Sequence, residues 1–185
     1  MNQRQKLTLI TAVAALLGIV LILSVVWVVS EEQRFSHYRN KKGGFSIRYP
    51  ASWAYEENLG GAAVIFFSPQ ENDLDFFKES VNVVVQDLSA NPMELKPYSE
   101  IAIEQMRLVF KDNFVILESG LTFISGQPGY KLIFLGKGPE NELKYMSVWT
   151  IKNQTAYQVT YTALSSQYDR YQLKVKRMLS SFRID

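Results

Sequence analysis

The feature of this chain that most constrains its fold is an uncharged, mostly apolar run of twenty-three residues from Leu7 to Val29. As an α-helix rising about 1.5 Å per residue, the run is about 35 Å long and exceeds the ~30 Å hydrocarbon core of a bilayer. Trp27 lies near its far end, where an indole ring suits the membrane interface. We therefore predict a tail over residues 1–6 and one transmembrane helix over residues 7–29 that binds the lipid bilayer.

Two other interpretations of this run are weaker. A cleaved signal peptide has an apolar region of only about 7–15 residues and an A-x-A-like cleavage site, whereas here the run is longer and ends in Val28-Val29-Ser30. A helix in a protein core rarely runs this long without a polar face. An uncleaved anchor is the interpretation we favour.

The orientation of the anchor depends on the size of the C-terminal domain that it carries. Basic residues flank the run on both sides, so the positive-inside rule does not decide; these residues are Arg4, Lys6, Arg34, Arg39, Lys41 and Lys42. Large C-terminal domains translocate largely regardless of flanking charge. We expect a single-pass protein of the cell or thylakoid membrane whose C-terminal domain is extracytoplasmic or lumenal.

The composition of the 185-residue chain excludes several classes of protein. A formal net charge of +2 does not suggest a nucleic-acid partner. The absence of cysteine excludes disulfides, thiol nucleophiles and Cys-type zinc sites. After a polar linker over residues 30–44, residues 45–185 have the length of one domain with one core.

The pattern of apolar residues in this domain predicts strands and two helices in the order βββ-α-ββββ-α. Alternating or β-branched segments predict the strands, and apolar residues at helical spacing predict one helix over residues 99–112 and another that starts near Ser166. The last four strands are expected at 114–124, 129–136, 142–152 and 155–164. Short turns between them require antiparallel pairing. The expected fold class is α+β with a central antiparallel sheet.

The segment Gly44 to Trp53, GFSIRYPASW, resembles the opening of PsbP-like domains. Four further segments fit the same pattern in order: Val64–Pro69, Gly126–Tyr130, Tyr157–Tyr161 and Ser181–Ile184. The resemblance covers about residues 38–185 and implies an α/β/α sandwich. These motifs are structural, so they bear on the fold more than on the function.

The resemblance also implies a range of functions. PsbP is an extrinsic lumenal subunit of photosystem II that helps the oxygen-evolving centre retain calcium and chloride. Similar domains include bacterial DcrB-type lipoproteins and a Ran-binding nuclear protein of fungi. This chain differs from plant PsbP because it carries a predicted membrane helix in place of a transit peptide, and because its only histidine, His37, lies in the predicted linker.

Candidate catalytic residues are few. His37 has no cysteine to activate, and no G-x-S-x-G motif supplies a serine nucleophile for it. A solvated linker residue is the simpler interpretation of this histidine. We therefore predict that the protein is not an enzyme. A hydrolase that uses pairs of Asp or Glu residues is the less favoured alternative.

Asp73 and Asp75 are the candidate metal ligands. They lie two residues apart in an acidic stretch from Glu71 to Glu79, as carboxylates in oxygen-ligand cation sites do. The stretch lacks the glycine and the distal glutamate of an EF-hand, so a solvated loop is the competing interpretation. Calcium or manganese is the ion that these residues would bind.

The function predicted from the sequence is that of a non-enzymatic accessory protein. Its domain, held at the membrane, would bind, stabilise or help assemble a membrane protein complex, and the resemblance suggests a photosynthetic complex of the photosystem II type. The alternatives are a domain that binds a small ligand or a divalent cation such as calcium outside the cytoplasm, and the hydrolase named above.

Overall fold

The computed structural model describes residues 34–70, 72, 75–138 and 141–185. The predicted tail and transmembrane helix, residues 1–29, therefore lie outside the described residues and stay predictions, as does the placement of Asp73. In the described part of the chain, neither helix has the length and apolar character needed to cross a bilayer. Residues 36–185 form one compact unit.

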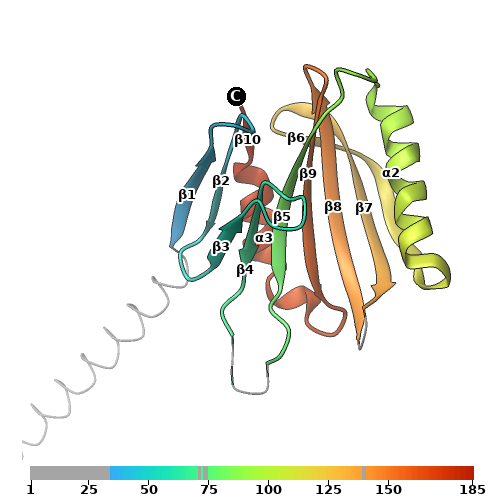
Figure 1. Ribbon diagram of the computed structural model, residues 1–185. Coiled ribbons are helices and arrows are strands. Elements are labelled where there is room, and N and C mark those ends of the chain that lie inside the picture. The colour runs from blue at the N-terminus through green and yellow to red at the C-terminus, as the bar shows by residue number, and fades with distance from the viewer. Residues whose placement is uncertain (1–33, 71, 73–74, 139–140) are drawn as a thin grey trace, which may run out of the picture. The chain divides into compact units, whose positions relative to one another are not determined.

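The described strands and helices follow one another in a mainly antiparallel arrangement (Figure 1). In chain order they are β1 (Phe35–Asn40), β2 (Phe45–Pro50), β3 (Ala54–Glu57), β4 (Val64–Phe67), β5 (Ser80–Asp87), α2 (Leu95–Phe110), β6 (Val115–Ile124), β7 (Gln127–Lys137), β8 (Glu142–Lys152), β9 (Thr155–Leu164), α3 (Gln172–Ser181) and β10 (Arg183–Ile184).

These strands form two sheets. The larger sheet has seven strands in the order β3-β4-β5-β9-β8-β7-β6, and the smaller has three in the order β1-β2-β10. Two-residue turns connect β6 to β7 and β8 to β9. Both residues of each turn have positive φ: 53° and 72° at Ser125 and Gly126, 49° and 55° at Asn153 and Gln154. Such turns match the twist of paired strands and so fix the register of both hairpins.

The first of two apolar cores lies between α2 and one face of the large sheet. Trp149, Leu132 and Phe134 are almost fully buried and point toward α2. The indole Nε1 of Trp149 donates a hydrogen bond to Ser99 Oγ of α2 at 2.8 Å. Because a buried polar group without a partner is costly, this bond fixes how α2 lies on the sheet.

The second core lies on the opposite face of the large sheet. The side chains of Phe66, Val81 and Tyr161 alternate away from the α2 face and are fully buried. They are covered by the small sheet and by α3, which lies behind β4 and β5 in Figure 1 and packs on β2. The rings of Phe45 in β2 and Phe182 after α3 lie 5.5 Å apart between their centroids.

These observations confirm the predicted fold class: α+β, with a central antiparallel sheet and two helices. Several details differ from the prediction. Residues 30–44 are not all linker, because β1 forms within them. Two short strands, β3 and β10, are absent from the predicted order. The first helix begins at Leu95, not at residue 99, because Pro97 lies in its first turn, where a helix tolerates proline.

The second helix also begins later than predicted. Ser166 precedes a short 3₁₀ turn over Tyr168–Arg170, and α3 itself starts at Gln172. Tyr168 is buried within this turn, and its backbone C=O accepts a hydrogen bond from the Tyr161 hydroxyl at 3.0 Å. The helical spacing of apolar residues that predicts a helix from Ser166 therefore includes Tyr168, which is buried by the 3₁₀ turn and not by α3.

Candidate functional site

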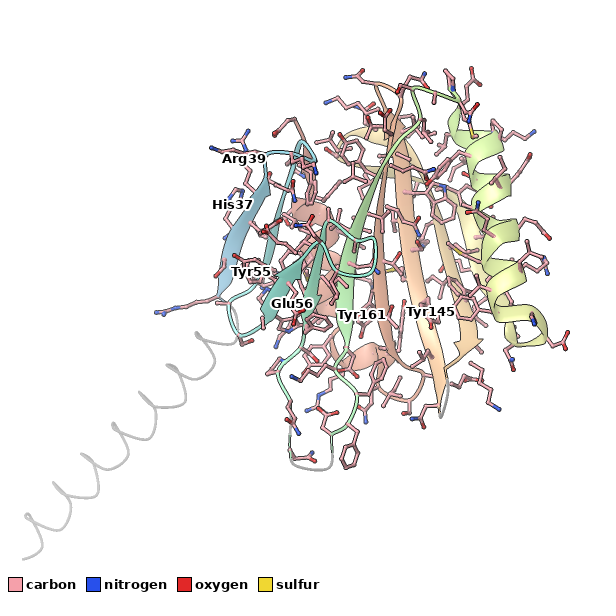
Figure 2. The ribbon with its side chains drawn as sticks, in the orientation of Figure 1. His37, Arg39, Tyr55, Glu56, Tyr145 and Tyr161 are labelled. Atoms are coloured by element: carbon pink, nitrogen blue, oxygen red, sulfur yellow. The ribbon has the colours of Figure 1, made fainter. Side chains whose placement is uncertain are left out.

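His37, the histidine considered as a general base, lies on β1 and not in a linker. It is exposed on the outer strand of the small sheet, and Figure 2 shows it beside Arg39, which is also exposed on that strand. A base must lie within hydrogen-bond reach of the proton that it removes and be oriented by a partner. The strand places His37 at the surface, and it is not among the residues that line the two cavities described below.

The candidate metal ligands are only partly described. Asp75 is half-buried, and its backbone N–H donates to Asn72 C=O at 3.0 Å. Asp73 lies outside the described residues. Among the residues that are described, no three His, Asp or Glu side chains lie together as a metal site would require. The prediction of calcium or manganese at Asp73 and Asp75 therefore stays a prediction.

Strand β6 is an edge of the large sheet with unusually many exposed apolar side chains. Leu121 and Phe123 are 83% and 77% exposed, and Leu117 is 50% exposed. No other described strand pairs with the outer side of β6. An edge strand presents unpaired N–H and C=O groups, and soluble proteins usually protect such edges with charge or short length.

A groove separates β6 from α2. It encloses about 320 Å³ and is lined mainly by apolar side chains: Leu95 and Ile103 of α2, Leu121 of β6 and Tyr130 of β7. Leu121 pairs with Tyr130 across the strands, so both side chains lie on the face that carries α2. We call Leu121, Phe123 and the apolar residues of this groove the β6 surface.

Strand β6 pairs regularly with β7 along only part of its length. The pairing of β6 with β7 shifts between Ile116 and Glu118, which leaves Leu117 in a bulge. A bulge bends a strand and ends regular pairing locally. Beyond it, Glu118 forms an ion pair with Lys131 of β7. The stretch from Glu118 to Ile124 is therefore the part of the edge with geometry suited to another strand.

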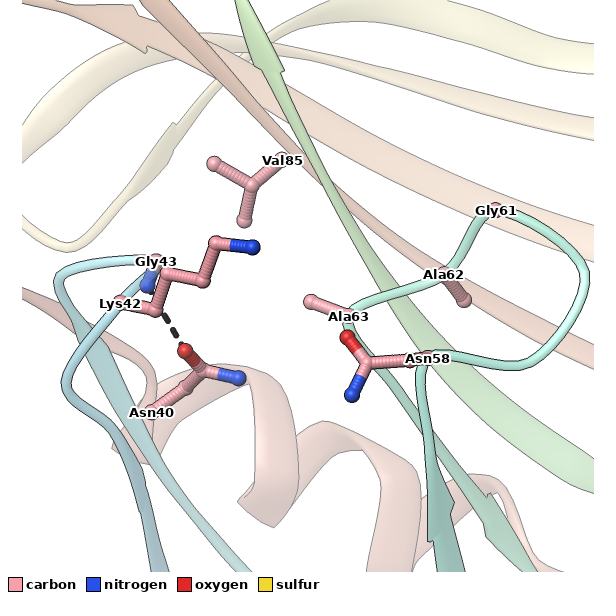
Figure 3. Close-up of a pocket in the computed structure, with 8 residues that line it drawn as sticks. All are labelled: Asn40, Lys42, Gly43, Asn58, Gly61, Ala62, Ala63 and Val85. Atoms are coloured by element: carbon pink, nitrogen blue, oxygen red, sulfur yellow. Dashed lines mark hydrogen bonds between the residues drawn. The ribbon is translucent and has the colours of Figure 1, made fainter.

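A second, polar cavity lies near the other edge of the large sheet. It encloses about 320 Å³ between the β1–β2 turn and the β3–β4 loop. Figure 3 shows the side chains of Asn40, Lys42 and Asn58 around it, with Val85 of β5 on one side. We call it the turn cavity.

A buried phenol supports the wall of the turn cavity. The Tyr38 hydroxyl donates to Glu57 Oε1 at 2.5 Å and accepts a hydrogen bond from Asn40 Nδ2 at 3.0 Å. Burial, and then the hydrogen bond to the Glu57 carboxylate, raise the pKa of Tyr38 to about 12. The pair joins β1 to β3, and it holds Asn40 in place at the cavity.

Sequence reasoning identified neither the β6 surface nor the turn cavity. The run Val115-Ile116-Leu117 is apolar without alternation, a pattern consistent with a buried strand, so it gives no indication of an exposed edge. Nothing local indicates the turn cavity, because Lys42 and Asn58 come from separate connections that only the folded sheets bring together.

The sequence and the fold agree on the family. The sequence pattern of the PsbP family matches residues 33–184, so this chain belongs to the PsbP family. A search among curated proteins finds no match.

Three solved structures share the fold. The PsbP protein of the cyanobacterium Synechocystis, CyanoP, is 15% identical, with a TM-score of 0.62 over 82% of this chain and 92% of that one. LpqN of Mycobacterium tuberculosis, involved in cell envelope biogenesis, is 10% identical with a TM-score of 0.62 over 82% and 90%. The Ran-binding protein Mog1p of Saccharomyces cerevisiae is 10% identical with a TM-score of 0.57 over 82% and 95%. At these identities the likeness shows the fold alone.

Proposed function

We propose that this protein is a non-enzymatic, membrane-anchored accessory protein whose domain binds and stabilises a membrane protein complex through the β6 surface. The observation that carries the proposal is the long apolar edge strand beside the α2 groove. Large apolar patches next to an unpaired edge are typical of protein-binding surfaces. The family to which the chain belongs suggests a photosynthetic complex, of the photosystem II type, as the partner.

The β6 surface combines two sources of binding energy. A partner strand along residues 118–124 would satisfy the free N–H and C=O groups of the edge. Its side chains would also cover Leu121 and Phe123, which are mostly exposed in the domain alone. Burying an apolar side chain of this size contributes about 1.5–3 kcal/mol. A few buried side chains near the centre of a contact usually supply most of its binding energy.

Tethering would strengthen this contact. In the proposal, residues 7–29 anchor the protein in the membrane and the domain lies outside the cytoplasm. A short connection to the anchor confines the domain near the membrane, which raises its effective concentration toward a membrane partner. A weak contact on the β6 surface is then sufficient for stable association.

The test is co-migration of the full-length protein with a larger complex. The tagged chain is extracted from its native membranes in mild detergent and separated by native electrophoresis and size exclusion. We expect the wild-type chain to migrate with a membrane complex in stoichiometric amounts. Leu121→Glu with Phe123→Glu should abolish this co-migration, because charge on the β6 surface opposes its burial.

Leu173→Glu is the matched control. Leu173 lies on α3, outside the β6 surface, and is 75% exposed. This variant also replaces an exposed apolar side chain with a glutamate, adding one negative charge where the double variant adds two, and it should keep the complex. Recovery of the wild-type chain alone would overturn the accessory function, and retention of the complex by the double variant would overturn the role of the β6 surface.

A further inference from the structure

We propose that the turn cavity is a binding site for a small monovalent carboxylate with a short aliphatic part. The β6 surface belongs to one edge of the large sheet, whereas the turn cavity is built from β1, β2 and the β3–β4 loop near the other edge. The two sites share no residue. The carboxylate site can therefore be tested independently of the proposed accessory function.

Hydrogen-bond donors converge on the turn cavity. Lys42 extends its ammonium group into the space that Asn40, Asn58 and Val85 surround, as Figure 3 shows. No described residue forms an ion pair with Lys42, and no described residue forms a hydrogen bond with the side chain of Asn58. An ammonium has only donors, and each amide NH₂ offers two. Lys42 and Asn58 are exposed, so solvent reaches these groups in the free protein. Together with the NH₂ of Asn40 they can donate to an oxyanion that enters the cavity.

The amide of Asn40 is held by two hydrogen bonds that leave one of its N–H groups available for a ligand. Its Oδ1 accepts a hydrogen bond from the Gly43 backbone N–H at 2.7 Å. Its Nδ2 must therefore lie on the other side, where one hydrogen is directed to the Tyr38 hydroxyl and the second remains available. The Tyr38–Glu57 bond fixes this orientation before any ligand arrives, and pre-organised donors bind at lower entropic cost.

The residues that line the turn cavity include no carboxylate. Two acidic groups on neighbouring elements have other partners: Glu57 accepts from Tyr38, and Asp185 pairs with Arg39 at 3.1 Å. An internal acid therefore does not satisfy the ammonium of Lys42. A single ammonium with neutral amides matches one negative charge better than the two of a phosphate dianion.

The rest of the lining is apolar or lacks side chains. Val85, Ala62 and Ala63 supply methyl groups, and Gly61 and Gly43 leave room at the rim. Gly61 has φ of 84°, a conformation that favours glycine, so the open shape of the loop is built into its backbone. Small-molecule sites combine such an apolar wall with a few placed polar groups. A short aliphatic chain suits this wall.

The size of the turn cavity fits a small molecule and not a protein segment. Its volume of about 320 Å³ lies at the lower end of the range of about 300–1,000 Å³ for small-molecule sites. Two turns and one strand line it, and Lys42 and Asn58 are exposed, so it is open to solvent. A compact ligand with one charged end is the chemistry that the cavity accommodates.

The test is a ligand-observed NMR titration of the full-length protein in detergent with sodium butyrate, alongside sodium phosphate and sodium chloride at equal ionic strength. We expect saturable binding of butyrate in the millimolar range, accompanied by a rise in melting temperature. Phosphate and chloride should compete weakly. Absence of saturation with butyrate, or tighter binding of phosphate, would overturn the carboxylate site.

Two variants locate the site. Lys42→Met removes the charge and keeps an apolar stem, and it should weaken butyrate binding about tenfold or more, as the loss of a charge-assisted hydrogen bond does. Asn58→Gly removes one amide and should weaken butyrate binding by a smaller factor. Glycine readily adopts the φ of 57° found at this position, so the backbone should be unchanged.

Lys41→Met is the matched control, because Lys41, like Lys42, is exposed on this turn, but it does not line the turn cavity. Its affinity for butyrate should equal that of the wild-type protein. An equal loss of affinity in Lys41→Met and Lys42→Met would show a general charge effect and overturn the site.

Discussion

The two edges of the seven-stranded sheet are built in opposite ways. β3 has four residues, two of them glutamates, and pairs with β4 along its full length. β6 has ten residues, and its exposed side chains include Leu121 and Phe123. The first edge has the short length and charge with which proteins block unwanted pairing. The second lacks such protection beyond Glu118, as the partner contact proposed above requires.

Different aromatic side chains pack beneath the two edges. Phe66 underlies β3 and contacts Tyr38 and Tyr49 through their rings, while Phe134 underlies β6 and contacts Phe110 and Phe114. Both phenylalanines are buried. The two edges therefore rest on separate aromatic clusters, one in each core, and each can be weakened without removing the other.

The largest expected effect comes from the aromatic clusters. Phe134→Ala and Phe66→Ala should each lower the free energy of unfolding by about 3–5 kcal/mol, because each leaves a cavity in a packed core. Chemical denaturation of the full-length protein in detergent measures this loss. Hydrogen exchange should then show faster opening of β6 in the first variant and of β3 in the second. Equal opening of both edges in both variants would contradict the separation of the two cores.

A smaller effect is expected from the phenol that ties β1 to β3. Tyr38→Phe removes the hydrogen bond to Glu57 and should lower the free energy of unfolding by about 1–2 kcal/mol at neutral pH. Thermal unfolding of the two proteins at one pH measures the difference.

The same phenol makes stability depend on alkaline pH. The pKa of Tyr38 is raised to about 12 in the folded protein from about 10 in the unfolded chain. The folded state thus favours the protonated phenol, so its contribution is complete below pH ~10 and is lost as pH rises toward ~12. Tyr38→Phe should lose less stability than the wild type across this window. Parallel pH curves for the two proteins would contradict this assignment.

The smallest effect is expected at the ion pair on β6. Glu118→Gln should change the free energy of unfolding by about 0–1 kcal/mol, because Glu118 and Lys131 are both partly exposed and solvent screens their attraction. The difference from wild type should vanish in high salt. A loss that persists in high salt would show that Glu118 acts through packing instead.

The sequence predicts the central elements of the fold better than its margins. The long hairpin strands β6 to β9 and the second half of α2 lie where apolar pattern and turn residues predict them. For β1 the sequence predicts a linker, because Tyr38 is the one buried side chain of the strand and most of its neighbours are polar. β3 is wholly exposed, so its strand conformation depends on pairing with β4 and not on its own pattern.

The candidate sites could not be predicted because both depend on tertiary placement. β6 is an edge only because the chain places β7 on one side of it and no described strand on the other. Lys42 and Asn58 meet across a cavity from turns that are sixteen positions apart in the sequence. The predictions at residues 7–29 and at Asp73 lie outside the described residues and are still to be tested.

The pairing of β2 with β10 has a consequence for how the protein folds. Strands β6 to β9 form a run of adjacent hairpins, whose contacts are close in sequence, and such contacts form early. Ser46 instead pairs with Arg183, across nearly the whole domain. We expect the hairpin run to assemble first, with the small sheet completed only in the last stage, after residues near Arg183 have emerged from the ribosome.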